Sequence, residues 1–168
     1  MTPAPTGFRT VLVTASSLAL ALFSTSCADQ ETAEPESNMN QTQAEERIEE
    51  YIDHAAAELP GDVELSSEGD PAFPACEGEP GEENHKVNVR HIFWVDGIPE
   101  EQNEDIAESL YSYWNTGNWK VTKDERPEGS RIEARNRADD FSMDLIVDQD
   151  GRPSLAAYSP CVHADDNL

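Results

Sequence analysis

Residues 141–158 of the sequence, FSMDLIVDQDGRPSLAAY, predict two antiparallel strands joined by a tight turn. The dipeptide Asp150-Gly151 is typical of a two-residue type I′ turn between strands. Alternate residues before this turn are apolar and are expected to point into a core: Phe141, Met143, Leu145 and Val147. This region is therefore expected to supply two neighbouring strands of a sheet.

Tight pairing across this turn would leave an apolar patch on the face opposite that core. It would set Ile146 opposite Leu155, with Ala157 two residues further along the same face. Either the first helix of the chain covers this patch or a binding partner does. We favour the helix, because its own apolar stripe needs a surface to cover, and we keep Ile146, Leu155 and Ala157 as a candidate interaction patch.

Two more strands are expected before the hairpin, at residues 119–122 and 131–137. Charged residues alternate outward along the second of them: Arg131, Glu133, Arg135 and Arg137. A two-residue turn at residues 139–140 would set Arg135 opposite Asp144, which pairs opposite charges across the strands. We therefore interpret the arginine row as a neutralised outer face and not as an anion site.

The elements further upstream complete the predicted fold. Residues 85–95 (HKVNVRHIFWV) alternate as a strand, with apolar residues on both faces near its end. Residues 42–59, which begin with a capping-box pattern, and residues 99–116 have apolar side chains at helical spacing. Residues 62–84 read as a long acidic loop. The chain is thus predicted to be α+β, with a mostly antiparallel five-stranded sheet packed with two helices in the order α-β-α-β-β-β-β.

The N-terminal residues 8–29, FRTVLVTASSLALALFSTSCAD, are typical of a secretory signal, because a basic residue precedes an apolar run and small residues follow it. The run is shorter than the roughly 20 apolar residues of a spanning helix. Cleavage after Ala28 would release a secreted protein, whereas cleavage before Cys27 would give a lipoprotein with its lipid on Cys27. Residues 29–43 are polar and acidic, as a flexible tether requires, and so we favour the lipoprotein.

This interpretation fixes the expected organisation of the chain. A signal peptide covers residues 1–26, and the lipidated Cys27 with a disordered acidic tether covers 27–43. A single domain spans 44–163 and a tail spans 164–168. The protein is expected on the extracytoplasmic face of the cell membrane, held by its lipid. If Cys27 is lipidated, the remaining cysteines of this exported chain form one disulfide, between Cys76 and Cys161.

The formal net charge is −24 at pH 7, from 35 acidic residues against 11 lysines and arginines. Nucleic acid is therefore a poor partner, because phosphate binding needs a basic face. The charge as a whole also opposes binding to an anionic membrane surface. High acidity is consistent with solubility and mutual repulsion at the envelope, or with life in salt.

No pattern in the sequence points to catalysis, a metal or a cofactor. The segment 148–151 starts like a calcium loop but lacks the later ligand positions. His85 and His91 would lie about 20 Å apart along a straight strand, too far for one metal ion. The aromatic residues near the second helix are interpreted as core and not as a carbohydrate platform: Tyr111, Tyr113, Trp114 and Trp119.

Short motifs give the chain a family resemblance. They are Cys27, Tyr113-Trp114 followed by residues 117–121 (GNWKV), and residues 159–162 (SPCV). With this layout, residues 44–163 resemble the envelope lipoproteins of actinobacteria, including the LppA-like mycobacterial group. The resemblance implies a cell-envelope lipoprotein with the Cys76–Cys161 pair in its folded part, and it brings no established activity.

The expected function is that of a lipid-anchored, non-catalytic binding or accessory domain of the cell envelope. Its partners would be the membrane, through the lipid on Cys27, and an unidentified envelope protein or ligand. Two alternatives remain open at this point. One is a cell-wall hydrolase that uses a carboxylate pair, and the other is a small-ligand carrier with a pocket between the sheet and the helices.

Overall fold

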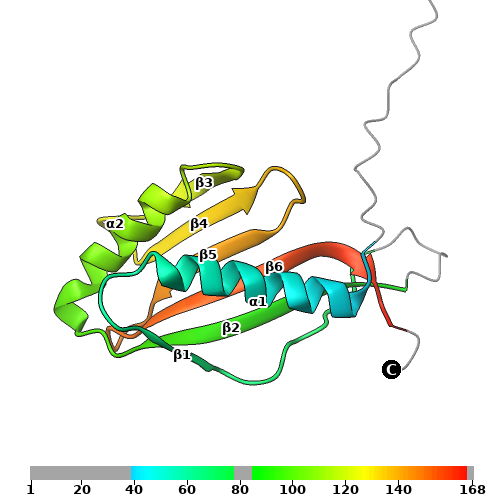
Figure 1. The fold of residues 1–168 in the computed structure, drawn as a ribbon, viewed down its shortest axis with the longest axis horizontal. Coiled ribbons are helices and arrows are strands. Elements are labelled where there is room, and N and C mark those ends of the chain that lie inside the picture. The colour runs from blue at the N-terminus through cyan, green and yellow to red at the C-terminus, as the bar shows by residue number, and fades with distance from the viewer. Residues whose placement is uncertain (1–38, 78–84, 166–168) are drawn as a thin grey trace, which may run out of the picture. The chain divides into compact units, whose positions relative to one another are not determined.

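The computed structural model describes residues 39–77 and 85–165 (Figure 1). It contains two α-helices, one short 3-10 helix and six strands. The helices are α1 (Gln41–Ala57), η1 (Glu100–Gln102) and α2 (Asn103–Tyr113). The strands are β1 (Glu64–Ser67), β2 (Lys86–Asp96), β3 (Trp119–Asp124), β4 (Arg131–Asn136), β5 (Ser142–Val147) and β6 (Pro153–His163). The predicted signal peptide, Cys27 and most of the tether lie outside the described residues.

The strands form one antiparallel sheet in the order β1-β2-β6-β5-β4-β3. The α+β class and the two helices are therefore confirmed, but the predicted count of five strands is wrong. The additional strand is β1, which lies in the predicted acidic loop and pairs with the end of β2. Its sequence, ELSS, has one apolar residue, and such a short polar edge strand gives no periodic signal.

Helix α1 begins slightly earlier than predicted. Asn40 is its N-cap, and the Asn40 side chain accepts a hydrogen bond from the Gln43 amide at 2.9 Å. The Gln43 side chain accepts one in return from the Asn40 amide at 3.1 Å. This reciprocal pair is the capping box, and it replaces the one predicted to start at Thr42. Residues 41–43, the last three of the predicted tether, therefore belong to the helix.

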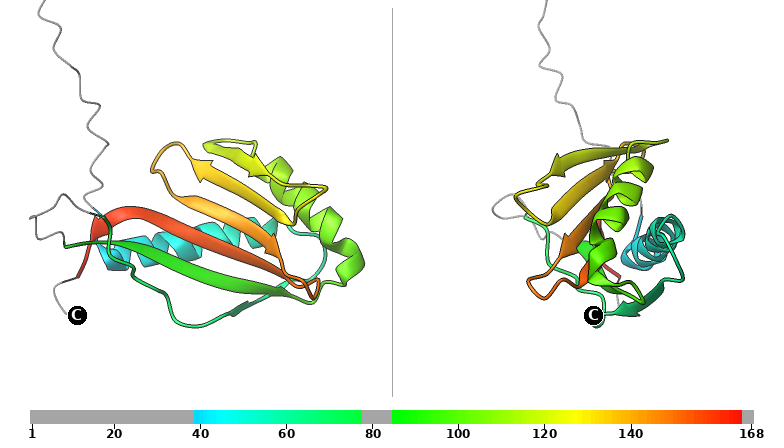
Figure 2. Two further views of the ribbon diagram at one scale, coloured as in Figure 1. Left: turned by 180° about the vertical axis from the view of Figure 1, so that it is seen from behind. Right: turned by 90° about the vertical axis from the view of Figure 1, so that its left-hand side faces the viewer.

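Both helices lie against the same face of the sheet, and Figure 2 shows the other face turned toward the viewer without a helix over it. The covered face holds the hydrophobic core, to which both helices and the strands contribute. Its largest fully buried side chains include Ile48, Ile52, Ile106, Leu110, Trp114, Ile132, Phe141, Met143, Leu145 and Leu155. Trp114 and Trp119 are both buried, which agrees with their interpretation as core residues.

The hairpin of β5 and β6 has a different register from the predicted one. Leu145 pairs with Leu155, and Ile146 pairs with Ser154. The turn is longer than two residues, because Asp148 and Arg152 still bond through their backbones and Gly151 has a φ of 77°. A shift of one residue moves a strand's side chains to the other face.

The predicted apolar patch is therefore wrong. Leu155 and Ala157 face the helices and are fully buried in the core. Ile146 lies on the opposite, uncovered face and is only half-buried. The expectation that the first helix covers this part of the sheet holds for Leu155 and Ala157, and it does not apply to Ile146.

The hairpin of β4 and β5 is also shifted. Asn136 bonds Phe141 through its backbone, and Asp140 adopts a φ of 62°, so residues 137–140 form the turn. Arg135 consequently pairs with Ser142, and Asp144 pairs with Glu133. The predicted pairing of Arg135 with Asp144 is wrong, because the turn consists of the four residues 137–140 and not of residues 139–140 alone.

A buried polar network joins α1 to this turn. The Tyr51 hydroxyl donates to Asp139 at 2.6 Å and accepts from the Asn136 amide group at 3.1 Å. The Tyr51 ring packs edge-to-face against Trp119 and Phe141, with centroids 5.0 and 5.6 Å away. Tyr51 therefore fixes the position of α1 over the sheet through both its ring and its hydroxyl.

Candidate functional site

The predicted disulfide is present between Cys76 and Cys161, whose Cα atoms are 6.1 Å apart. It joins the segment after β1 to the end of β6. The Cys76 amide also donates to the Lys86 carbonyl at 3.0 Å, and Ala75 bridges to Val87. The segment is thus held along the outer edge of β2 by both backbone bonds and the disulfide.

The uncovered face of the sheet gathers most of the lysines and arginines in the described residues. The register places them opposite one another on neighbouring strands. Lys120 on β3 pairs with Arg135 on β4, and Arg135 pairs with Ser142 on β5. Ser142 pairs with Tyr158 on β6, and Tyr158 pairs with Arg90 on β2. These five residues form one row across five strands, which we call the cationic row.

A hollow of about 460 Å³ adjoins the middle of this row, where Arg135, Ser142 and Tyr158 line it, whereas the end residues Lys120 and Arg90 do not. Its lining includes Arg131, Arg135, Ser142, Asp144 and Tyr158. At 3% exposure, Asp144 is buried although it lies on the face of the sheet that no helix covers. Its carboxylate is 2.6 Å from the Arg131 guanidinium, which also contacts Glu133 at 3.2 Å.

The pKa values in the hollow reflect this burial. Desolvation raises the pKa of Asp144, and the hydrogen bonds and charge of Arg131 only partly oppose it. Burial and the neighbouring Asp144 raise the pKa of the Tyr158 hydroxyl. Tyr158 therefore stays protonated and remains a hydrogen-bond donor at neutral pH.

Two carboxylates, Glu133 and Asp144, face each other in the hollow, one of them with a raised pKa. A hydrolase that works through a carboxylate pair needs such a difference. Arg131, however, contacts both carboxylates, and Lys123 contacts Glu133 at 3.7 Å. This arrangement favours a structural ion cluster, and the predicted absence of catalytic residues stays a prediction.

An apolar group adjoins the row on the same face. Ile92 pairs with Ala156, and both Trp94 and Ile146 pair with Ser154. Ala156 is 1% exposed, but it lies on the uncovered face and is not part of the hydrophobic core. The guanidinium of Arg152 lies over the Trp94 ring, 4.3 Å from its centroid. The uncovered face thus combines cations with half-buried apolar side chains.

A second hollow of about 520 Å³ lies where α2 meets the β3–β4 connection and the end of β5. Its apolar lining comes from the core residues Ala107, Ile132 and Leu145 and from the half-buried Val147. Polar side chains also line it, including Asn103, Glu104, Asp124 and Arg126. The buried Oδ1 atom of Asn103 has no hydrogen-bond partner. We call this hollow the α2 cleft.

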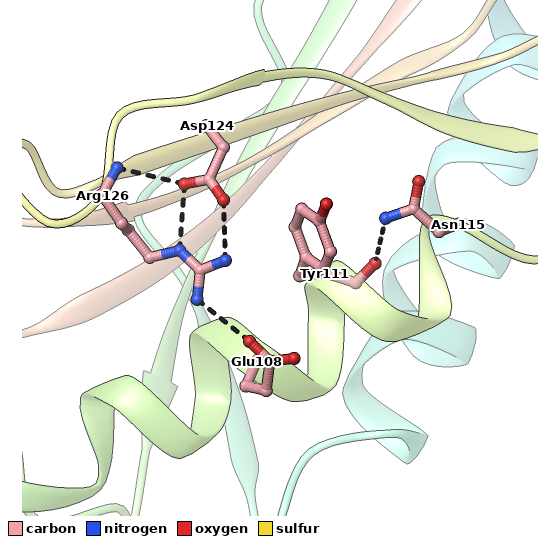
Figure 3. A network of polar contacts seen from close by, with 5 residues as sticks. All are labelled: Glu108, Tyr111, Asn115, Asp124 and Arg126. Atoms are coloured by element: carbon pink, nitrogen blue, oxygen red, sulfur yellow. Dashed lines mark hydrogen bonds and ion pairs between the residues drawn. The ribbon is translucent and has the colours of Figure 1, made fainter.

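Arg126 is held in place by a network at the α2 cleft (Figure 3). Its guanidinium binds both oxygens of Asp124, at 2.9 and 2.7 Å, and reaches Glu108 of α2 at 3.5 Å. It also lies 5.3 Å from the centroid of the Tyr111 ring. The hydrogen bond from Arg126 lowers the pKa of Asp124. The nearby carboxylates outnumber the single guanidinium, so this cleft suits a neutral or cationic group better than an anion.

Neither a metal centre nor a membrane span is found in the described ranges. Residues 39–77 and 85–165 contain no group of three or more metal-ligating side chains. Among the same residues, no helix is long and apolar enough to cross a membrane. His91 instead contacts the Ser67 hydroxyl at 2.8 Å and packs on Phe93.

Comparison with known proteins returned no significant match to a family model, a curated protein or a solved structure.

The cationic row was not predicted from the sequence, although its one member on β4, Arg135, was identified as outward-facing. The missing information was the length of two turns. The positive φ at Asp140 and the position of Gly151 set the register, and only the register places Arg135 beside Ser142 and Tyr158.

Proposed function

We propose that this chain is a lipid-anchored, extracytoplasmic protein of the cell envelope whose folded part is a non-catalytic binding domain. The layout of residues 8–29, with Cys27 after small residues, supports export and lipidation. The disulfide between Cys76 and Cys161 supports an oxidising compartment. The proposal also assigns the chain to the actinobacterial envelope lipoproteins that it resembles.

The proposed binding role depends on the composition of the uncovered face of the sheet. Trp94, Ile92 and Ile146 are only partly buried there, and they stand beside lysines and arginines. Aromatic and arginine side chains are enriched at binding surfaces, because they combine a large apolar area with directed hydrogen bonds. The outward surfaces of α1 and α2 are instead strongly acidic.

The test is mass mapping of the full-length protein expressed in its native host, without reduction. We expect the membrane fraction to contain a chain that starts at a diacylglyceryl-modified Cys27, with Cys76 linked to Cys161. The variant Cys27→Ala should lose the lipid and leave the membrane fraction. A wild-type chain that starts at Asp29 without lipid would refute the anchor.

A small-ligand carrier is the second candidate function, and the α2 cleft favours it. Its volume of about 520 Å³ lies within the range of roughly 300–1,000 Å³ that is typical of ligand pockets. The cleft lies between the sheet and a helix and has an apolar lining. Native mass spectrometry of protein purified from envelope extracts tests it, since a carrier should retain a ligand that Ala107→Trp excludes.

A further inference from the structure

The cationic row has an arrangement that suits a linear anion. Its members are Lys120, Arg135, Ser142, Tyr158 and Arg90, each opposite the next on adjacent strands. Neighbouring strands lie about 4.8 Å apart, so the row extends over roughly 19 Å. It contains three cations, two hydroxyl groups and no carboxylate.

The cations of the row are available to a partner. Within the described residues, neither Arg90 nor Lys120 forms an ion pair with a carboxylate. Arg135 contacts Asp140 at 3.0 Å, but both side chains are well exposed, at 55% and 39%. An exposed pair of this kind contributes little and exchanges readily for another anion.

Two further carboxylates near the row, on β4 and β5, are already engaged. Asp144 and Glu133 both contact Arg131, and Glu133 also contacts Lys123. They therefore repel an incoming anion less than free carboxylates would. The chain as a whole has a charge of −24, so a basic strip on this face differs sharply in potential from the acidic helices behind it.

The hollow beside the row favours one class of anionic partner over the others. Ser142 and Tyr158 line it together with Arg135, and the Ser142 hydroxyl can bond to a phosphate oxygen or to an alcohol group. The Tyr158 hydroxyl bonds to Asp144 and can still accept a hydrogen bond from an alcohol group. A flat bilayer surface would not enter a hollow. A peptide lying on a sheet face would find no backbone groups to pair with, because those point along the sheet and not out of it.

We propose that the cationic row binds a linear polymer in which phosphate groups alternate with hydroxylated units, such as a polyol phosphate or a phosphoglycan. Arginine forks match phosphate oxygens, and Ser142 and Tyr158 match the hydroxylated unit between two phosphates. The inference rests on the proposed function, since it names the partner of the binding face. The ion pairs of Arg131 and Arg135 agree with the sequence-based interpretation of the outward arginines of β4 as neutralised, and the proposal requires only that Arg135 exchange its exposed pair with Asp140 for a phosphate.

The experiment measures binding of poly(glycerol phosphate) to the full-length protein in detergent, by calorimetry over a range of salt concentrations. The test variant is Arg90→Ala/Arg135→Ala, and its matched control is Arg47→Ala/Arg137→Ala. The control makes the same change in net charge at residues of α1 and of the 137–140 turn, neither of which is one of the five residues of the row. Thermal unfolding checks that both variants keep the wild-type midpoint to within about 2 °C.

We expect the test variant to bind at least about tenfold more weakly, and the control to change affinity less than about twofold. Loss of two phosphate contacts should also flatten the slope of log affinity against log salt by about 1.4. Ser142→Ala should weaken binding without changing that slope. Equal losses in the test variant and the control would overturn the proposal, because net charge alone would then explain binding.

Three further probes separate the polymer from other partners. Polyglutamate tests an acidic peptide, vesicles with phosphatidylglycerol test an anionic membrane, and dextran tests a neutral glycan. Tighter binding to any of them than to poly(glycerol phosphate) overturns the proposal. This outcome is distinct from a failure of the lipid anchor, which is measured separately at Cys27.

Discussion

The carboxylate of Asp144 lies 2.6 Å from the guanidinium of Arg131 on the face of the sheet that neither helix covers. The Asp144 side chain is 5% exposed and the Arg131 side chain is 38% exposed. The anion is therefore buried and its partner is not. Burial of a charge is costly unless it is paired, so Asp144 depends on Arg131.

Replacement of Arg131 by leucine should destabilise the fold. The change leaves Asp144 buried without its main partner, and we expect a loss of about 1–3 kcal/mol in the free energy of unfolding at pH 7. Urea denaturation measures it. Arg135→Leu is the matched control, because its pair with Asp140 is exposed and should contribute less than about 0.5 kcal/mol. Equal effects of the two variants would show that Asp144 does not need Arg131.

The raised pKa of Asp144 predicts a pH dependence of stability. A carboxyl group whose pKa is higher in the folded state binds more protons there than in the unfolded state. Its contribution to stability is therefore greatest in acid and falls as the pH rises through the raised pKa. Asp144→Asn should become more stable relative to wild type between about pH 4 and pH 7. A stability difference that stays constant over this range contradicts the assignment.

Tyr51 should be one of the most sensitive polar residues of the core. Tyr51→Phe keeps the ring contacts but removes the hydrogen bonds to Asp139 and Asn136, which should cost about 1–2 kcal/mol. Burial and Asp139 raise the pKa of Tyr51 from 10.0 to about 12. The wild-type protein should accordingly lose stability between these two pH values, and the variant should lose less. Chemical denaturation with absorbance titration of the tyrosines measures both effects.

The disulfide should be a large single contribution to stability. It closes a sequence separation of 85 residues, for which the chain-entropy model gives an upper value of about 4.5 kcal/mol. We expect Cys76→Ser/Cys161→Ser to unfold about 2–4 kcal/mol more easily than the oxidised wild type. Reduced wild-type protein should behave like the variant in urea denaturation. Unchanged stability would mean that the backbone bonds of this segment suffice.

Gly97 is required by the turn that follows β2. Its φ is 87°, and a Cβ atom added there would lie 2.9 Å from the backbone oxygen of Asp62. Gly97→Ala should therefore cost at least about 1 kcal/mol, because neither the backbone conformation nor the Asp62 carbonyl can adjust easily. Gly69→Ala is the control, since its position has no atoms within 4 Å and no positive φ. Thermal denaturation of the two variants should separate them clearly.

Local sequence patterns predicted most of the secondary structure. The period-two alternation in residues 85–95 and 141–147 corresponds to β2 and β5, and the apolar stripes at helical spacing correspond to α1 and α2. The pairing of Cys76 with Cys161 was predicted by counting cysteines under the expectation that the chain is exported and Cys27 is lipidated. Strand β1 was missed, because its edge position allows a polar sequence with Leu65 as the only inward apolar residue.

The face to which each strand's side chains point could not be predicted as reliably. Asp150-Gly151 suggested a two-residue turn, but only Gly151 has a positive φ, and the turn is longer. The added residue moved Leu155 and Ala157 into the core and left Ile146 on the other face. The turn at residues 137–140 changed the partner of Arg135 but not its face, and placed it opposite Ser142.

The sequence by itself determined the α+β class, the helices, most of the strands and the cysteine pair, because these depend on local periodicity and residue chemistry. Only the tertiary structure decided the register, the covering of one face by both helices, and the cationic row. Register depends on turn conformations and on packing between distant segments, which no local pattern encodes. A row made of one residue from each of five strands is therefore visible only after folding.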